Sequence, residues 1–364
     1  ANASWYGEAG ADYSGYSLKY AGDVNGDKYD DFIIGAYGND YSGSTAGKTY
    51  LFLGSNSGFN RNINLSSANA SWYGEVTSDY SGYSVSYLGD FNNDGYDDIA
   101  VGAYGNDYGG SSAGKTYLIL GSSSGFNPNT NLSSADASWY GETASDYSGL
   151  AVSSAGDVNN DGYDDIIIGA YGNDYGGSTA GKTYLILGSS SGFGLNTNLS
   201  SANASWYGET ASDYAGYTVS SAGDVNNDGY DDILIGAYLN DYSGSNSGKT
   251  YLIYGSSSLS PNVNLSNANA SWYGEVSSDF SGRAISSAGD VNNDGYDDIL
   301  IGAYGNDYGG TSGGKTYLIY GSNSLSLNIN LSNANASWYG EEGDSYSGFA
   351  VSKAGDVNGD EFDD

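Results

Sequence analysis

The stretch Asp90-Phe-Asn-Asn-Asp-Gly-Tyr-Asp-Asp98 decides the fold, because six near-copies of it recur at the same place in a repeat of 66 or 67 residues. Carboxylate or amide oxygens at positions 1, 3, 5 and 9, with glycine at position 6, suit a hard divalent cation held in a tight turn. The other copies are Asp23–Asp31, Asp157–Asp165, Asp224–Asp232, Asp290–Asp298 and Asp356–Asp364. We therefore expect one calcium loop in each repeat, and up to six calcium ions in all.

In the second loop, Asp90, Asn92 and Asp94 are expected to offer side-chain oxygens, Tyr96 its carbonyl and Asp98 a carboxylate. A metal-free turn rich in Asx residues is the alternative. We favour calcium because clustered carboxylates repel one another unless a cation or protons intervene. The equivalent ligands are Asp23, Asn25, Asp27, Tyr29 and Asp31; Asp157, Asn159, Asp161, Tyr163 and Asp165; Asp224, Asn226, Asp228, Tyr230 and Asp232; Asp290, Asn292, Asp294, Tyr296 and Asp298; and Asp356, Asn358, Asp360, Phe362 and Asp364.

Two loops depart from the pattern, because Lys28 and Glu361 replace the glycine at position 6. We expect a positive φ at both residues, which costs on the order of 1 kcal/mol in a residue other than glycine. Lys28 also brings a positive charge close to the cation. The first site is therefore predicted to be the weakest.

Tryptophan marks the period, with spacings of 67, 67, 67, 66 and 66 residues between Trp5, Trp72, Trp139, Trp206, Trp272 and Trp338. Within one period, short apolar runs at 83–88, 99–104 and 115–120 alternate with acidic or Gly/Ser/Asn-rich loops, and a fourth run leads from Asn131 to Trp139. Such runs, β-branched or aromatic and bounded by turn residues, are typical of strands. No segment keeps a helical period, and 58 glycines interrupt every candidate. The sequence predicts four strands per repeat.

The second and third strands are nearly continuous apolar runs, which indicates burial on both faces by neighbouring sheets. Four short antiparallel strands per repeat fit the blade of a β-propeller better than a β-helix or separate sandwiches. We predict an all-β chain that forms a single β-propeller domain over residues 1–364, with a calcium loop between the first and second strands of each blade. The repeats are 1–67, 68–134, 135–201, 202–267 and 268–333, with a partial repeat at 334–364.

A closed ring of six or seven blades needs more than five complete repeats. Residues 1–8 match an outer strand, so they could complete a blade begun by residues 347–364. Two arrangements remain open: sequence outside these residues completes the ring, or neighbouring chains exchange strands and build a filament.

Composition narrows the classes of function. The 44 acidic and 10 basic residues give a formal charge of -34, which argues against nucleic acids and anionic lipids as partners. No apolar run approaches the roughly 20 residues of a membrane span. Cysteine, histidine and methionine are absent, which removes disulfides, thiol or imidazole catalysis and the usual zinc and copper ligands. Every candidate acid recurs in each repeat, so we expect a multivalent surface rather than an enzyme.

A load of weak calcium sites favours the outside of the cell, where modules bind calcium with Kd values of about 10⁻⁴ to 10⁻³ M. Asparagines that open glycosylation triplets agree with that compartment, although repetition could have copied a chance match. They are Asn2, Asn64, Asn69, Asn131, Asn198, Asn203, Asn264, Asn269, Asn330 and Asn335.

The segment Gly109-Gly-Ser-Ser-Ala-Gly-Lys-Thr116 matches the spacing of a phosphate-binding loop, as do 176–183 and 309–316. Such a loop must open a helix, whereas a predicted strand follows here. We therefore do not expect nucleotide binding. The lysines of this position are expected to balance nearby carboxylates: Lys48, Lys115, Lys182, Lys249 and Lys315.

The motifs Tyr80-Ser-Gly-Tyr-Ser-Val85, Gly89 to Asp98, Gly102-Ala-Tyr104 and Gly114-Lys-Thr-Tyr117 resemble the FG-GAP repeat of integrin α-subunit propellers and their microbial, extracellular relatives. The resemblance covers essentially the whole chain. Two features differ: a serine splits the aromatic-glycine pair, and tyrosine replaces the proline of the GAP element. Those tyrosines are Tyr37, Tyr104, Tyr171, Tyr238 and Tyr304.

The resemblance implies a ligand-binding face opposite the calcium loops. The loops between the second and third strands should lie there, and their Tyr, Ser, Gly and Asn content suits recognition surfaces, although they could equally be polar turns without a ligand. Their candidate residues are Asn39, Asp40, Tyr41, Asn106, Asp107, Tyr108, Asn173, Asp174, Tyr175, Asn240, Asp241, Tyr242, Asn306, Asp307 and Tyr308. The repeated Trp-Tyr-Gly-Glu could be a sugar platform, but packing between blades is favoured.

These observations predict a secreted or cell-surface scaffold for adhesion or interaction, with structural calcium and a protein or glycan ligand. A glycan-binding lectin is one alternative. The other is a structural subunit of a surface layer or extracellular filament that contacts further copies of itself.

Overall fold

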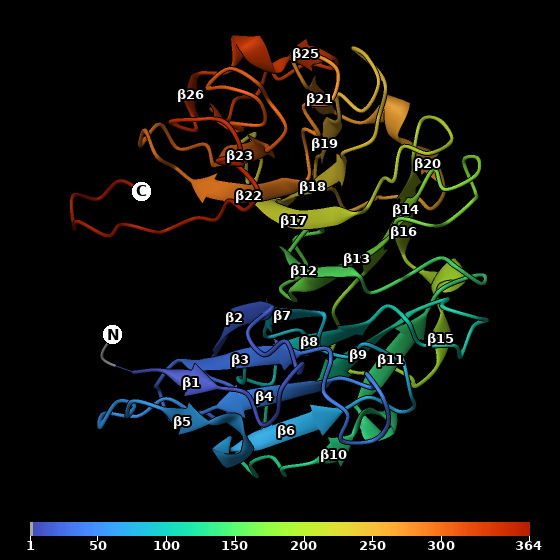
Figure 1. Cartoon of the computed structure of the whole chain (residues 1–364), viewed down its shortest axis with the longest axis vertical. Coiled ribbons are helices and arrows are strands. Elements are labelled where there is room, and N and C mark those ends of the chain that lie inside the picture. The colour runs from blue at the N-terminus through green and yellow to red at the C-terminus, as the bar shows by residue number, and fades with distance from the viewer. Residues whose placement is uncertain (1–2) are drawn as a thin grey trace. The chain divides into compact units, whose positions relative to one another are not determined.

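The computed structural model describes residues 3–364 and is nearly all β (Figure 1). Its helical elements, within that range, are single turns of 3-10 helix: η1 (Leu65–Ser67), η2 (Leu132–Ser134), η3 (Leu199–Ser201), η4 (Leu265–Asn267) and η5 (Leu331–Asn333). None of the described helices is long and apolar enough to cross a membrane. The prediction of an all-β fold is confirmed.

The chain folds into two compact units. Unit 1 comprises residues up to Ser154, Tyr163–Ala170 and Leu187–Ala202, and unit 2 comprises Ala155–Gly162, Tyr171–Ile186 and Asn203–Asp364. Each unit is built from the same four-stranded antiparallel blade.

In unit 1, two blades are complete and follow the order first, second, third and fourth strand from one edge to the other. The first blade contains β2 (Ser17–Gly22), β3 (Asp31–Ala36), β4 (Lys48–Phe52) and β6 (Ala70–Tyr73). The second contains β7 (Ser84–Gly89), β8 (Asp98–Ala103), β9 (Lys115–Ile119) and β11 (Ala137–Tyr140). The short strands of unit 1 are β1 (Trp5–Tyr6), β5 (Ile63–Asn64), β10 (Thr130–Asn131) and β15 (Thr197–Asn198).

In unit 2, two further blades repeat the pattern. They contain β17 (Thr218–Gly223), β18 (Asp232–Ala237), β19 (Lys249–Ile253) and β21 (Ala270–Tyr273), followed by β22 (Ala284–Gly289), β23 (Asp298–Ala303), β24 (Lys315–Ile319) and β26 (Ala336–Tyr339). The short strands are β20 (Val263–Asn264) and β25 (Ile329–Asn330). The third repeat is divided between the units and contains β12 (Ala151–Gly156), β13 (Asp165–Ala170), β14 (Lys182–Ile186) and β16 (Ala204–Tyr207).

The second and third strands of each blade carry the core, as their apolar runs predict. Every residue of β8 and β9 is buried, and the ring of Tyr117 lies in a cluster with Ile99, Val101 and Leu132. Unit 2 has a matching cluster around Tyr317, Ile299 and Leu331. These residues pack each blade against its neighbour within the unit. The loops lie at the two ends of the strands, outside this core.

The fourth predicted strand, Asn131 to Trp139, is wrong in detail, because the chain turns within it. Asn131 accepts a hydrogen bond from the Ser133 N–H and caps η2. Only residues 137–140 then pair with β9. Before the turn, β10 pairs in parallel with β6 of the preceding blade, with Thr130 opposite Trp72. The short strands β10, β15, β20 and β25 thus each cover the edge of the preceding blade.

Candidate metal sites

Each acidic loop joins the first strand of a blade to the second and closes on its own carboxylates. In the second loop, Asp90 Oδ1 accepts the Asp94 N–H (2.9 Å) and Oδ2 accepts the Gly95 N–H (2.7 Å). Asp94 donates its N–H to Asn92 Oδ1 (2.9 Å) and accepts the Tyr96 N–H at Oδ1 (3.1 Å). The side chains at positions 1, 3 and 5 therefore gather over one turn, as the pattern predicts.

The aspartate at position 9 is buried at the entry of the second strand. Asp98 Oδ2 accepts the Phe91 N–H (3.0 Å) and Oδ1 accepts the Gly121 N–H (2.7 Å), which ties the loop to the end of β9. Burial raises the pKa of Asp98 to about 8; the Gly121 N–H opposes the shift, and the charges of Asp94 and Asp90 add to it. Burial likewise raises the pKa of Asp232 to about 8 and those of Asp31 and Asp298 to about 6.

The donor set fits a hard cation in its chemistry. Asn226 Oδ1 and Asn292 Oδ1, at position 3 of the fourth and fifth loops, are buried and have no hydrogen-bond partner. An oxygen left without a partner at this position, beside carboxylates of positions 1 and 5, is suited to coordinate calcium. Within residues 3–364, however, no three acidic side chains converge closely enough to form a ready-made cage. Binding would require the carboxylates of positions 1 and 5 to turn partly from the backbone toward the ion.

The predicted backbone at position 6 is confirmed. Lys28 and Glu361 adopt φ values of 71° and 74°, in the region that glycine occupies in the other loops. The Lys28 N–H still donates to Asp23 Oδ2 (2.7 Å), as the Gly95 N–H does to Asp90. These two loops carry glycine at position 4 instead, at Gly26 and Gly359, where asparagine takes a positive φ elsewhere. That the first site is the weakest stays a prediction.

Two loops need separate description. The third is divided between the units, with Asp157, Asn159 and Asp161 in unit 2 and Tyr163 and Asp165 in unit 1. Asp157 Oδ2 accepts the Gly162 N–H (2.8 Å) and Asp165 Oδ1 accepts the Gly188 N–H (2.8 Å), so each half repeats the local pattern.

The sixth loop is exposed. The N–H of Glu361 lowers the pKa of Asp356, with help from the N–H groups of Gly359 and Asp360. Asp364 Oδ2 accepts the Val357 N–H (2.9 Å), so this loop also closes between its second and ninth positions.

Sequence reasoning missed the aspartate at position 8, which binds the loop of the preceding repeat. Asp97 Oδ2 accepts the N–H of Asp23 (2.7 Å), and the Asp97 N–H donates to the Asp23 carbonyl (3.3 Å). The same acceptor bonds join Asp164 to Asp90, Asp231 to Asp157, Asp297 to Asp224 and Asp363 to Asp290. We call Asp97, Asp164, Asp231, Asp297 and Asp363 the link aspartates. The glycine before each loop makes room for them: a Cβ at Gly223 would stand 2.1 Å from Asp297 Oδ2.

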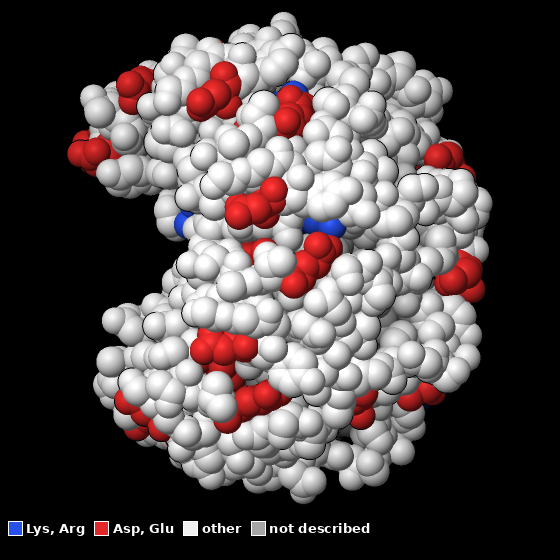
Figure 2. All heavy atoms as spheres, turned by 90° about the vertical axis from the view of Figure 1, so that its right-hand side faces the viewer, with Lys and Arg blue, Asp and Glu red and all other residues white. Residues whose placement is uncertain are grey.

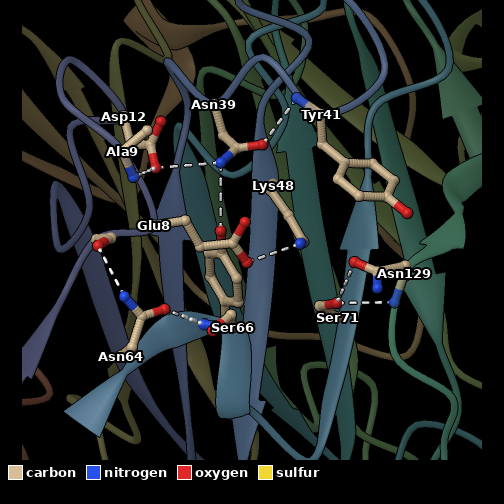
Figure 3. Close-up of polar contacts among 12 residues, drawn as sticks. Glu8, Ala9, Asp12, Asn39, Tyr41, Lys48, Asn64, Ser66, Ser71 and Asn129 are labelled. Carbon is tan, nitrogen blue, oxygen red and sulfur yellow. Dashed lines mark hydrogen bonds and ion pairs between the residues drawn. The ribbon is translucent and has the colours of Figure 1, made fainter.

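At the other end of the strands, the predicted ligand loops divide into buried and exposed residues. Asn39 is buried, donates to Asp12 Oδ2 (3.2 Å) and accepts the Tyr41 N–H (3.0 Å) (Figure 3). Asp40 Oδ1 accepts the Thr45 N–H. Asn106, Asn173, Asn240 and Asn306 are buried as well, whereas Tyr108, Tyr175, Tyr242 and Tyr308 are between 51 % and 68 % exposed. Among the candidate ligand residues, the tyrosines and the aspartates reach the surface.

The repeated lysines are buried in ion pairs, as expected. Lys48 Nζ lies 2.9 Å from Glu8 Oε1 and over the rings of Tyr41 and Tyr50 (Figure 3). Lys115, Lys249 and Lys315 pair with Glu75, Glu209 and Glu275, each at 2.7 Å. The Gly-rich segment before Lys115 leads into β9, so the strand predicted after this segment is confirmed.

The candidate glycosylation asparagines fall into two structural groups. Asn64, Asn131, Asn198, Asn264 and Asn330 are half-buried caps of the 3-10 helices. Asn69, Asn203, Asn269 and Asn335 are exposed. Asn2 lies outside the described residues. The face displayed in Figure 2 shows acidic side chains in many separate groups and little lysine or arginine, in agreement with the net charge.

Comparisons with known proteins point to the same repeat. The model of the FG-GAP repeat matches residues 81–119, 148–186, 215–253 and 281–319. Integrin alpha pat-2 of Caenorhabditis elegans is 32% identical over 249 residues, which cover 63% of this chain and 18% of that protein. Integrin alpha-IIb of Mus musculus is 35% identical over 176 residues (46% and 16%), and integrin alpha-V of Gallus gallus 34% identical over 176 residues (46% and 16%).

The chain thus spans less than a fifth of the length of these curated relatives. Each matched segment runs from the start of a first strand, through an acidic loop, to the end of the third strand, so each match covers three of the four strands of the blade that the structure repeats. The chain therefore contains FG-GAP repeats that are similar to those of integrin α chains.

Proposed function

We propose that this chain is a calcium-stabilised β-propeller domain that acts outside the cell, or at its surface, as a non-catalytic scaffold for adhesion or interaction. In this proposal residues 1–364 form one propeller domain, and its acidic loops take up to six calcium ions. Calcium is structural: it holds the first strand of each blade to the second. The partner is a protein or glycan that binds the face opposite the metal loops.

The observation that carries the calcium proposal is the repeated buried aspartate at position 9. Burial raises the pKa of Asp98 and Asp232 to about 8, so near neutral pH each carboxyl must keep its proton or gain a cation. A divalent cation beside positions 1, 3 and 5 would favour the ionised form of this carboxylate. The oxygens of Asn226 and Asn292 that lack a partner support the same choice.

Calcium titration of the EDTA-treated chain tests this proposal. We expect calcium to raise Tm and to bind with measurable heat, because folding of the loops is coupled to metal binding. Magnesium should raise the Tm less than calcium, since the smaller Mg²⁺ ion demands a stricter octahedral coordination geometry. Asp228→Ala should remove one site, whereas Glu342→Gln, at an exposed acid outside the loops, should remove none. An unchanged Tm together with no heat of binding would overturn the proposal.

The scaffold part of the proposal rests on the exposed tyrosines of the ligand loops and on the similarity to integrin α chains. Tyr41, Tyr108 and Tyr242 are half exposed and each lies about 5 Å from the ring of a second tyrosine: Tyr73, Tyr140 and Tyr273. Partly exposed tyrosine pairs of this tilted or edge-to-face kind also suit a sugar face, which keeps the lectin as a second candidate.

Two binding assays separate these candidates. A glycan array and a panel of immobilised extracellular matrix proteins are probed with the calcium-loaded chain and with a variant in which the five exposed loop tyrosines are serine. Loss of binding in the variant supports this face as the ligand site, and the array on which binding occurs decides between lectin and protein scaffold. Equal binding by both chains would refute the assignment of the face.

A further inference from the structure

We propose that each link aspartate is a positioning residue for the metal loop of the preceding repeat, so that calcium uptake is cooperative along the chain. The inference rests on the proposed calcium function and adds to it a coupling between sites. The proposal concerns neighbouring loops within one compact unit, where the contacts between them are established.

The fourth and fifth loops show the coupling most fully. The Asp224 N–H, at position 1 of the fourth loop, donates to Asp297 Oδ2 of the fifth loop (2.9 Å). The Asp297 N–H donates to the Asp224 carbonyl (3.2 Å). Both backbone polar groups of the first residue of one loop are therefore held by a single residue of the next. The Asp224 carboxylate is free to organise its own loop, where it accepts the N–H groups of Asp228 (3.0 Å) and Gly229 (2.8 Å).

Asp297 stands between two candidate ligands of its own loop. Its neighbours are Tyr296, which would offer its carbonyl, and the buried Asp298. A cation that fixes residues 296 and 298 must also fix the backbone of residue 297. The carboxylate of Asp297 then holds Asp224 in place before a cation reaches the fourth loop. The fourth loop is therefore partly ordered before its own cation binds, which raises the affinity of this loop for calcium.

The close approach of the two loops makes this coupling direct. Gly223, next to Asp224, has φ of 74°, and an added Cβ would meet Asp297 Oδ2 at 2.1 Å. No water or mobile side chain is needed between the two loops. By reciprocity, a cation in the fourth loop must favour binding in the fifth by the same factor. Because the link is repeated from loop to loop, we expect a Hill coefficient above 1 for calcium.

The substitution Asp297→Ala tests the link. Removing a residue that orients a metal ligand typically lowers metal affinity by about 10- to 100-fold. We therefore expect loop 4 to need at least about tenfold more calcium, seen as hydrogen-exchange protection of a peptide spanning residues 218–232. Asp297→Asn keeps an acceptor oxygen and should restore most of that loss. Asp30→Ala is the matched control: Asp30 holds position 8 of the first loop and is exposed, and its removal leaves the bond between Asp224 and Asp297 in place.

Three readouts keep this inference separate from the proposed function. If Asp297→Ala binds calcium with the affinity and Hill coefficient of the unaltered chain, the coupling is refuted. If the unaltered chain binds no calcium, the proposed function fails. The link itself is then decided in the calcium-free chain: faster exchange of the Asp224 amide in Asp297→Ala, and not in Asp30→Ala, supports the positioning role. Unchanged exchange overturns that role. If Asp297→Ala fails to fold, Asp297→Asn is compared with Asp297→Glu instead. The longer side chain of Asp297→Glu must displace the hydrogen bond to the Asp224 N–H, whereas Asp297→Asn keeps an acceptor for it.

Discussion

Removing one partner of the buried ion pair between Lys249 and Glu209 should cost far more stability than breaking a surface pair. Lys249 is 1 % exposed, its Nζ lies 2.7 Å from Glu209 Oε1, and the ammonium stands 4.4 Å and 5.0 Å from the ring centroids of Tyr242 and Tyr251. Glu209 follows β16 and Lys249 begins β19, so the pair joins two successive blades. The perturbation we consider is Lys249→Met, which keeps an apolar stem of similar length.

The magnitude follows from what remains after the substitution. Glu209 keeps its charge in a site where its side chain is only 19% exposed, and removal of one partner from a buried pair costs about 3 to 5 kcal/mol. This partial exposure places the expected loss near 3 kcal/mol. Loss of the two ring contacts adds about 1 kcal/mol. We therefore expect Lys249→Met to lower the free energy of unfolding by about 4 kcal/mol.

Equilibrium unfolding in urea, followed by tryptophan fluorescence, measures this loss. The double variant Lys249→Met/Glu209→Gln should be more stable than the sum of the single effects by about 2 kcal/mol, because no charge is left unpaired. Lys353→Met is the control, since Lys353 is 44% exposed in its pair with Asp363 and should lose under about 1 kcal/mol. A loss below 1 kcal/mol for Lys249→Met, or one equal to that of Lys353→Met, would refute the reasoning.

Three further predictions concern a glycine, the buried carboxyls and the glycosylation triplets. In a thermal melt, Gly223→Ala should lower the Tm more than Gly125→Ala. Both glycines have φ near 75°, which costs about 1 kcal/mol in alanine, but only at Gly223 would a Cβ meet the Asp297 carboxylate. Equal losses of Tm in the two variants would contradict this contact. In EDTA the Tm should fall as pH rises from 4 to 8, because the folded chain holds protons on buried carboxyls that the unfolded chain releases. These carboxyls are Asp31 and Asp298, with pKa values of about 6, and Asp98 and Asp232, with pKa values of about 8. Calcium should abolish this fall in Tm and Asp98→Asn should reduce it, whereas a Tm that rises over this pH range would contradict the role of the buried carboxyls. If the chain is expressed through a secretory pathway, mass spectrometry should find glycans on the exposed Asn69 and Asn269 before Asn131 and Asn264, which cap 3-10 helices; glycans on the capping residues alone would contradict this order.

Much of the blade was predictable because each strand has its own local signal. The run predicted at 99–104 is β8 (Asp98–Ala103) and the run at 115–120 is β9 (Lys115–Ile119), since both are apolar, bounded by glycine and long enough to show their burial. The two-residue strand β10 was not predictable, because two residues carry no period. Its pairing with β6 depends on a neighbouring blade rather than on its own composition.

The candidate site shows the same division. Sequence alone indicated the positive φ of Lys28, because the turn requires that conformation whatever residue stands there. It could not separate the roles of Asp97 and Asp98, which are adjacent and chemically identical. Asp98 is turned into its own blade, while Asp97 accepts a bond from a residue 74 positions away. Asn39 was expected on the surface with Tyr41, but its amide bridges Asp12 and Tyr50 inside the loop.

The pairing of β10 with β6 also has a consequence for synthesis on the ribosome. The outer strand of the first blade ends at Tyr73, but its edge is closed only by Thr130 and Asn131; the bond from Ser71 to Asn129 spans 58 residues of chain. A nascent blade therefore waits for most of the following blade before its last backbone groups are paired. For a designer who trims or lengthens the array, the cut belongs after the short strand that precedes the fourth strand of the next blade, and not directly after the fourth strand of the blade to be kept.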